Sequence, residues 1–376
     1  MKLQACALCD CRILPSNDSR EHIIPQALGG RKKVLGFICR KCNNNRGTSW
    51  DAALAAELNW FCVALNVSRE RGAPPKQRVK GLAGQNIWSH ADGSMTLDEP
   101  LVTVEKTDSG RRFLLKPQSM AEARKKLREI QKKHAEIDVE KELANAVINT
   151  VRPGVIYTTF AFCGELGGRS LVKTAMAMAY DMGIESHACD FALRYLRDSN
   201  AAPSLAEFYI RDFVLNRPSQ QLINSVTVTA DPRKNTLIAY VEYFGVVRYV
   251  VHLSQTYSGP PKHRTYAIDT KTGRPADLHV DLNLSDNEHA ASLADETGDE
   301  SRFPELFQYA MPIALKSLYA REDEHAMRIA IAEASEELGM KADEIPSPEK
   351  RDAFGTLLGK KIAIYFEQVM RLRPKI

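Results

Sequence analysis

The 376-residue sequence has no long hydrophobic run, no internal repeat and no low-complexity segment. A membrane-crossing helix needs about 20 consecutive apolar residues, so a protein with membrane-spanning helices is excluded. No signal peptide precedes the first cysteine, and we therefore expect a cytoplasmic protein, in which cysteine pairs bind metal more often than they form disulfides. The hydrophobic (44%) and charged (26%) fractions are ordinary for a soluble protein with a full core, and the length suits two or three domains.

Positive charge is concentrated at the N-terminal end of the chain. Residues 1–80 contain 14 Lys or Arg and 6 Asp or Glu, a net charge of +8, whereas the rest contains 37 basic and 41 acidic residues, a net charge of −4. The sum is the mild overall +4. A basic end on a near-neutral body suits contact with a polyphosphate such as nucleic acid.

Cysteine spacing gives the strongest local signal. Of the eight cysteines, four form two Cys-x-x-Cys pairs, Cys6 with Cys9 and Cys39 with Cys42. Two such pairs predict a structural zinc site, because each turn offers two thiolates to one tetrahedral ion. Cys11 is a spare ligand at a less suitable spacing. The other three are expected to be small buried residues: Cys62, Cys163 and Cys189.

The segment between the two pairs carries a second pattern. From Glu21 to Gly30 it reads Glu-His-Ile-Ile-Pro-Gln-Ala-Leu-Gly-Gly, and Asn43 directly follows the last cysteine. Together with the Cys pairs, this pattern resembles the HNH endonuclease family, whose zinc-braced site has a ββα-metal fold. The spacing is also similar to that of phage endonuclease VII-type resolvases, in which an Asn likewise follows the last Cys. The resemblance covers about residues 5–60.

The resemblance implies a role for each of these residues. His22 would be the general base that activates a water for attack on a phosphodiester, and Glu21 and Asn43 would hold a catalytic Mg²⁺ or Mn²⁺. The zinc would be held by Cys6, Cys9, Cys39 and Cys42. The expected partner is nucleic acid, with DNA favoured. The alternative interpretation of His22 is a buried histidine with a structural hydrogen bond.

The sequence departs from the family at one place. Many members have a middle Asn about five residues before the third Cys, where it orients the histidine, but Val34 stands here and no Asn lies between Glu21 and Cys42. A backbone carbonyl is then expected to hold the imidazole. Two alternatives to a nuclease stay open: a non-catalytic, zinc-dependent nucleic-acid-binding protein, and a zinc-stabilised interaction module on an unrelated metabolic body.

Other polar residues near the motif have weaker signals. Four basic residues are candidates for phosphate contacts that add affinity without reading sequence: Arg31, Lys32, Lys33 and Arg46. Asp51 is either an additional metal ligand or a helix cap, and the cap is favoured. Trp50 and Trp60 are expected in the core.

The chain as a whole is predicted to be α+β, with an N-terminal zinc-bound ββα (HNH) module followed by a larger mixed domain with an antiparallel sheet and C-terminal helices. We expect the module at 1–65, a basic linker with β-hairpins at 66–117, and a substrate-selecting or regulatory region at 118–376. Periodicity predicts helices at 51–65, 119–151, 169–182, 187–197 and, broken near residues 346–348, 303–373. An antiparallel meander is predicted from strands at 225–230, 236–244, 246–253 and 266–269, and an exposed loop at 286–301. Restriction or phage defence is a setting suggested by analogy alone.

Overall fold

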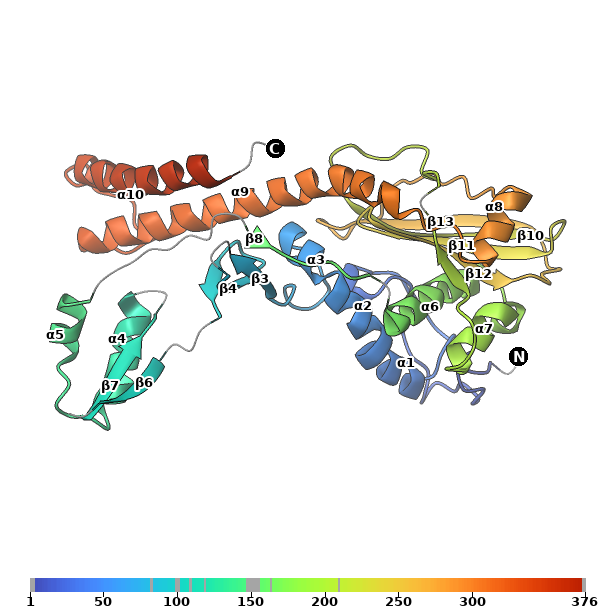
Figure 1. Cartoon of the computed structure of the whole chain (residues 1–376), viewed down its shortest axis with the longest axis horizontal. Coiled ribbons are helices and arrows are strands. Elements are labelled where there is room, and N and C mark those ends of the chain that lie inside the picture. The colour runs from blue at the N-terminus through green and yellow to red at the C-terminus, as the bar shows by residue number, and fades with distance from the viewer. Residues whose placement is uncertain are drawn as a thin grey trace. The chain divides into compact units, whose positions relative to one another are not determined.

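A computed structural model describes residues 4–81, 84–98, 102–107, 110–117, 120–146, 156–162, 164–208 and 210–373. It confirms the α+β class, with helices and antiparallel sheets along the chain (Figure 1). The chain forms two compact units, one of residues 1–75 and 160–322 and the other of residues 76–159 and 323–375. These bounds differ from the three segments expected from the sequence, because the N-terminal module packs with a part of the chain that follows much later. Cys163 lies outside the described residues.

The N-terminal module is a ββα unit. Strand β1 (Glu21–His22) pairs antiparallel with β2 (Lys33–Val34), and helix α1 (Arg40–Arg46) follows. Helix α1 contains the run of three asparagines that begins at Asn43. The predicted helix over 51–65 exists as three consecutive pieces, the π-helical turn η2 (Gly47–Asp51), α2 (Ala52–Glu57) and α3 (Asn59–Leu65). Both predicted core tryptophans, Trp50 and Trp60, are buried.

The two glycines that end the Glu-His-Ile-Ile-Pro-Gln-Ala-Leu-Gly-Gly segment are required by the backbone conformation. The short helix η1 (Gln26–Leu28) ends at Gly29, which has a left-handed φ of 90° that favours glycine. A Cβ atom on Gly30 would lie 1.7 Å from the carbonyl oxygen of Ile24, so no larger residue fits. The turn that returns the chain from β1 to β2 therefore depends on both glycines.

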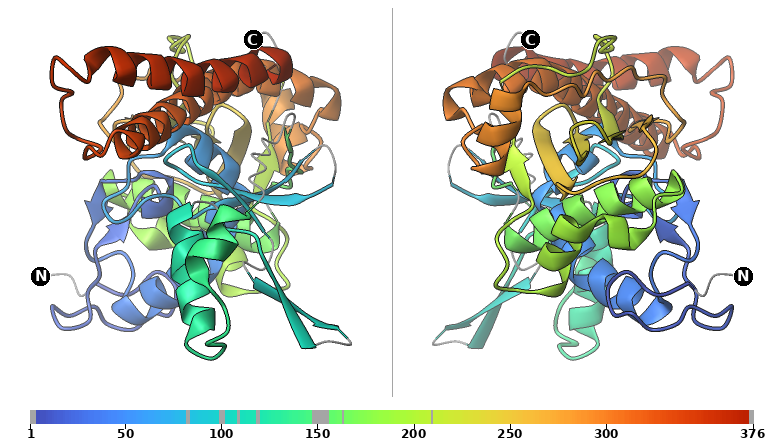
Figure 2. Two further views of the ribbon diagram at one scale, coloured as in Figure 1. Left: turned by 90° about the vertical axis from the view of Figure 1, so that its left-hand side faces the viewer. Right: turned by 90° about the vertical axis from the view of Figure 1, so that its right-hand side faces the viewer.

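Helix α6 (Glu165–Asp181), predicted from periodicity at 169–182, is the central helix of this unit. Every residue from Gly167 to Ala179 is buried. One side packs on the large sheet, where Thr174 Oγ1 lies 3.2 Å from the hydroxyl of Tyr243, and α2 and η2 of the N-terminal module contact the helix as well. Helix α6 thus lies between the sheet and the module (Figure 2).

The large sheet has five antiparallel strands: β9 (Leu205–Glu207), β10 (Ile223–Asp231), β11 (Thr236–Tyr243), β12 (Val247–Ser254) and β13 (Lys262–Asp269). Their order is β13-β10-β11-β12-β9, so the predicted simple meander is wrong for its last strand. Strand β13 pairs with β10 because β9 takes the free edge of β12. The short helix α7 (Asp190–Arg197) also packs on β12.

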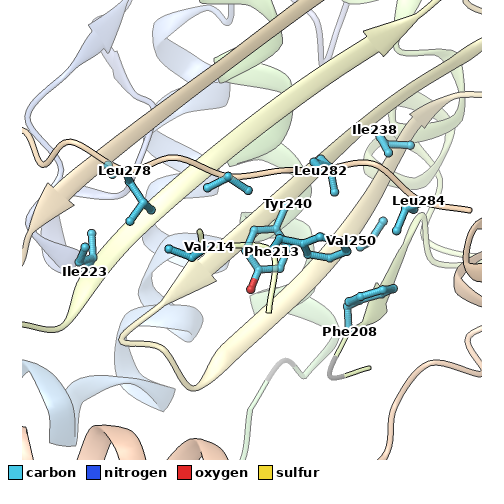
Figure 3. Close-up of a cluster of buried hydrophobic side chains, with 12 residues drawn as sticks. Phe208, Phe213, Val214, Ile223, Ile238, Tyr240, Val250, Leu278, Leu282 and Leu284 are labelled. Carbon is cyan, nitrogen blue, oxygen red and sulfur yellow. The ribbon is translucent and has the colours of Figure 1, made fainter. Parts of the chain in front are cut away.

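The face of the sheet opposite α6 has its own apolar core. Tyr240, Val250 and Ile238 from the central strands meet Phe208 and Phe213, whose rings stack with centroids 4.6 Å apart (Figure 3). The extended segment 278–284 covers them with three leucines: Leu278, Leu282 and Leu284. Because both faces are covered, the central strands are buried almost throughout.

The predicted exposed loop at 286–301 is wrong over its first half. Helix α8 (Asp286–Leu293) begins there with a capping box, in which Ser285 Oγ accepts from the backbone N–H of Glu288 and the Glu288 carboxylate accepts from that of Ser285. The long helix α9 (Phe303–Glu337) follows, and the boundary between the two units falls inside it.

The second unit contains two small sheets and three complete helices among its described residues. One sheet has the order β5-β4-β3-β8, and the other is the hairpin of β6 and β7. Their bounds are Gln77–Gly81 (β3), Asn86–Ser89 (β4), Met95–Leu97 (β5), Val102–Thr107 (β6), Gly110–Leu115 (β7) and Ile156–Tyr157 (β8). The helix expected at 119–151 is two helices, α4 (Met120–Gln131) and α5 (Val139–Ala144), because Asp138 caps a new helix. Helix α10 (Arg351–Leu372) lies beside the end of α9, and Lys361 forms ion pairs with Glu333 and Glu337. Across the parts of the chain that are described, no helix has both the length and the apolar character needed to cross a membrane.

Candidate functional site

The structure brings the two Cys pairs together. The four sulfur atoms of Cys6, Cys9, Cys39 and Cys42 all lie within 4.8 Å of one another, and those of Cys9 and Cys39 are 3.8 Å apart. Sulfurs at the corners of a tetrahedron around zinc would be about 3.8 Å apart for Zn–S bonds of about 2.3 Å. The arrangement is therefore compatible with a structural zinc ion. Cys11, the spare candidate, is not a member of this group.

Backbone hydrogen bonds orient these sulfurs. The N–H of Cys39 donates to Cys6 Sγ at 3.3 Å, and the N–H of Cys42 donates to Cys39 Sγ at 3.5 Å, which also caps the start of α1. Burial raises the pKa of the Cys6 thiol, and burial together with the neighbouring sulfurs raises that of Cys42. Four thiolates this close repel one another, so their ionisation depends on the cation that they bind.

Glu21 points away from solvent, into the interior of the unit. Its side chain is only 4% exposed, and Oε1 accepts a hydrogen bond from the ammonium of Lys173 on α6. No hydrogen bond to the second oxygen, Oε2, is found among the described residues. Burial raises the pKa of the Glu21 carboxyl, and the charge of Lys173 opposes this effect.

Lys173 also binds Asp51, in the turn before α2. The Lys173 ammonium lies 2.7 Å from Asp51 Oδ2, and Asp51 Oδ1 accepts from the Ser170 hydroxyl at 2.6 Å. Burial lowers the pKa of Lys173, but the charges of Asp51 and Glu21 outweigh it and the net pKa is raised. Asp51 makes no helix-cap hydrogen bond, so the favoured cap interpretation is wrong. Its partners are instead two residues of α6.

His22 lies on the other face of β1, opposite Lys33 in the register of the ribbon. Its Nε2 atom is 3.3 Å from Glu70 Oε2, and the same oxygen accepts from Lys33 Nζ at 2.7 Å. The side chain of His22 is 21% exposed and thus reachable from solvent. Burial, and then the charge of Lys33, lowers its pKa, so the imidazole is neutral at pH 7.

Glu70 is the hydrogen-bonding partner of the His22 ring. Val34, at the family's Asn position, pairs with Glu21 in the ribbon and is buried. Among the residues that the structure describes, no backbone carbonyl bonds the His22 ring, contrary to expectation, and the carboxylate of Glu70 is its partner. A carboxylate only accepts hydrogen bonds, so Nε2 carries the proton in this contact and Nδ1 keeps its lone pair.

Asn43 lies in the first half of α1 and lines an open groove of about 620 Å³ at the surface of the module. No hydrogen bond of its side-chain amide is found within the described part of the chain. The groove is lined by Pro15, Asp18, Ser19, Arg20, Leu35, Arg40, Asn43 and Asn44. It therefore combines two amides, two arginines and an open shape.

The four predicted phosphate-binding residues all have contacts within the protein. Arg31 donates to Ser68 Oγ at 2.8 Å, and Lys32 pairs with Asp181 at 2.5 Å. Lys33 pairs with Glu70, and the Arg46 guanidinium stacks on the Trp50 ring at 4.4 Å. Arg20 and Arg40, which the sequence analysis did not single out, line the groove instead.

Two residues of the module, Glu21 and Asn43, carry hard oxygen donors. Glu21 Oε2 and the side-chain oxygen of Asn43 are hard oxygen donors of the kind that Mg²⁺ prefers, and neither has a hydrogen bond to a described residue. Two donors with water and phosphate oxygens are the usual complement for this ion. The residues that the resemblance assigns to the ion thus fit it chemically.

A two-stranded ribbon, a helix and a cluster of four cysteines define a ββα module with a candidate zinc site. Residues 6–59 match the family model described as HNH endonuclease, so the resemblance seen in the sequence is confirmed over this segment. No curated protein and no solved structure matches the chain.

Sequence reasoning missed two residues of this site, Lys173 and Glu70. Lys173 could have been noticed, because a lysine within the mostly apolar part of a helix is buried, and a buried charge needs a partner. Glu70 had none, since it is one of many charged residues in a Pro- and Gly-rich segment.

Proposed function

We propose that this protein is a metal-dependent HNH endonuclease that hydrolyses phosphodiester bonds of nucleic acid, with DNA as the favoured substrate. The observation that supports it most directly is the His22–Glu70 contact at 3.3 Å in a module that matches the family. A neutral imidazole, held by a carboxylate and partly exposed, has the properties of a general base.

In this proposal His22 Nε2 keeps its proton and donates it in the hydrogen bond to Glu70, and Nδ1 accepts the proton of the attacking water. Glu21 and Asn43 would hold Mg²⁺ or Mn²⁺, which polarises the phosphate and stabilises the leaving 3′ oxygen. The four cysteines, with structural zinc, would keep the ribbon and α1 in a fixed geometry. Arg20 and Arg40 in the groove would neutralise phosphates on either side of the cut. The predicted phosphate contacts would do the same where a bound strand reaches them: Arg31, Lys32, Lys33 and Arg46.

The test uses the full chain with supercoiled plasmid, single-stranded DNA and single-stranded RNA. Each substrate is incubated with Mg²⁺, with Mn²⁺ and with excess chelator, beside a His22→Ala variant. We expect cleavage only with metal and a loss of about 100-fold or more in the variant. Binding of nucleic acid without cleavage under every condition would favour the non-catalytic alternative, and cleavage of RNA alone would replace DNA as the substrate.

A further inference from the structure

Lys173 has an unusual position for a charged residue. Its side chain is 1% exposed, yet both of its partners, Glu21 and Asp51, belong to the N-terminal module, 152 and 122 positions earlier in the chain. Within the sequence Leu-Val-Lys-Thr-Ala-Met it is the one charged residue. A buried ammonium is destabilising unless it is paired, so the burial of Lys173 calls for an explanation.

The two carboxylates converge on one point, and the ammonium fills it. Two converging carboxylates are a common donor pair for divalent cations, and without Lys173 these two would carry a charge of −2 when ionised. Asp51 is fully engaged, since Oδ2 binds Lys173 at 2.7 Å and Oδ1 binds Ser170 at 2.6 Å. Glu21 uses only Oε1 in the pair.

We propose that Lys173 is a positioning residue of the nuclease site: it holds Glu21 by Oε1 and occupies Asp51, so that Glu21 alone presents an oxygen to the divalent ion. This inference rests on the proposed role of Glu21 in metal binding. It makes the site one of low charge that takes a single, weakly held ion. It also makes the active geometry of the module depend on α6, in the later part of the chain.

A purely structural role for Lys173 makes a different prediction. Breaking a buried ion pair would then loosen the module, and metal binding and cleavage would weaken together. The positioning role predicts opposite signs, because removal of one positive charge strengthens the attraction of the carboxylates for a cation while Glu21 loses its fixed orientation. Metal affinity, measured without nucleic acid, therefore separates the two roles.

The experiment titrates Mn²⁺ into the zinc-loaded full chain and follows free Mn²⁺ by electron paramagnetic resonance. The proteins are the wild type, Lys173→Met, Lys173→Arg as the charge-preserving control, and Asp51→Asn. We expect one Mn²⁺ per wild-type chain, binding about tenfold tighter or more in Lys173→Met, and near-wild-type binding in Lys173→Arg. Cleavage with Mn²⁺ should fall about tenfold or more in Lys173→Met and recover in Lys173→Arg. Zinc content and circular dichroism report whether each variant is folded.

Equal or weaker Mn²⁺ binding by a folded, zinc-containing Lys173→Met protein would overturn the inference, as would a wild type that binds no Mn²⁺. If Lys173→Met does not fold, Asp51→Asn decides, since the asparagine oxygen can still accept from Lys173 while its NH2 group donates to the Ser170 hydroxyl oxygen. Near-wild-type Mn²⁺ binding supports the inference, and lost binding makes Asp51 a ligand and overturns it. Failure of the proposed function has a separate signature, a wild type that binds Mn²⁺ but cleaves no nucleic acid.

Discussion

Removal of the contact between Glu70 and His22 should lower the rate of cleavage while changing the free energy of unfolding only slightly. Glu70→Ala removes the acceptor that fixes the proton on Nε2, at 3.3 Å, and leaves the imidazole free to rotate and to change tautomer. Loss of a comparable orienting partner lowers activity by roughly 10- to 100-fold, which corresponds to about 1.4–2.7 kcal/mol of transition-state stabilisation.

The stability of the fold should change far less. The side chains of His22, Glu70 and Lys33 are 21%, 29% and 31% exposed, so their ion pairs are partly solvated. Such pairs contribute about 0–1 kcal/mol, and we expect a change of that size in the free energy of unfolding. A loss of activity with nearly unchanged stability is thus the signature of an orienting role.

The assay is single-turnover cleavage of a labelled DNA duplex at saturating Mg²⁺, with urea denaturation of the same preparations. Glu305→Ala is the matched control, because it removes a glutamate from an exposed ion pair with Arg302 in a different element, helix α9. The control should keep wild-type activity. Wild-type rates in Glu70→Ala would refute the argument that Glu70 replaces the missing Asn as the partner of His22.

Two further predictions concern zinc and pH. Metal analysis should find one zinc per chain. Cys39→Ser should lose the zinc and melt at a lower temperature, whereas Cys11→Ser, outside the group of four sulfurs, should retain it. Retention of zinc in both variants would contradict the four-cysteine site. The second prediction follows from burial, which lowers the pKa of His252 to about 3, so that the unfolded chain alone takes up this proton as the pH falls below about 6.5. The free energy of unfolding is then lower at pH 5 than above pH 6.5 by about 2 kcal/mol from this residue alone. Urea denaturation at pH 7 and pH 5 should show that His252→Gln loses about 2 kcal/mol less than the wild type. An equal loss in the variant would show that His252 is not its source.

The parts of the site that could be predicted from sequence are those fixed by short-range geometry. Two residues between cysteines place both sulfurs on one turn, so the pairing of Cys6 and Cys9 with Cys39 and Cys42 followed from spacing. The burial of α6 followed from its run of alanine and methionine. Both are local properties, which pattern reasoning captures well.

The remaining parts depend on which segments meet in three dimensions. Glu70 and Lys173 are far from His22 and Glu21 in sequence, and only packing of α6 and of the segment after α3 brings them near. The same limit explains strand β13, whose pairing with β10 was decided by the position of β9. The start of α8 is a different case, because Ser285 and Glu288 form a readable capping box that the acidic composition of the segment obscured.

The central claim, that His22 makes this module a nuclease, is tested most directly by the rate of phosphodiester cleavage in His22→Ala. Cleavage of supercoiled plasmid by the full chain with Mg²⁺ should fall about 100-fold or more, while zinc content stays at the wild-type level. His279→Ala, at a well-exposed histidine of the same unit, should cleave like the wild type. Equal rates in the wild type and His22→Ala, with zinc retained in both, would contradict the account.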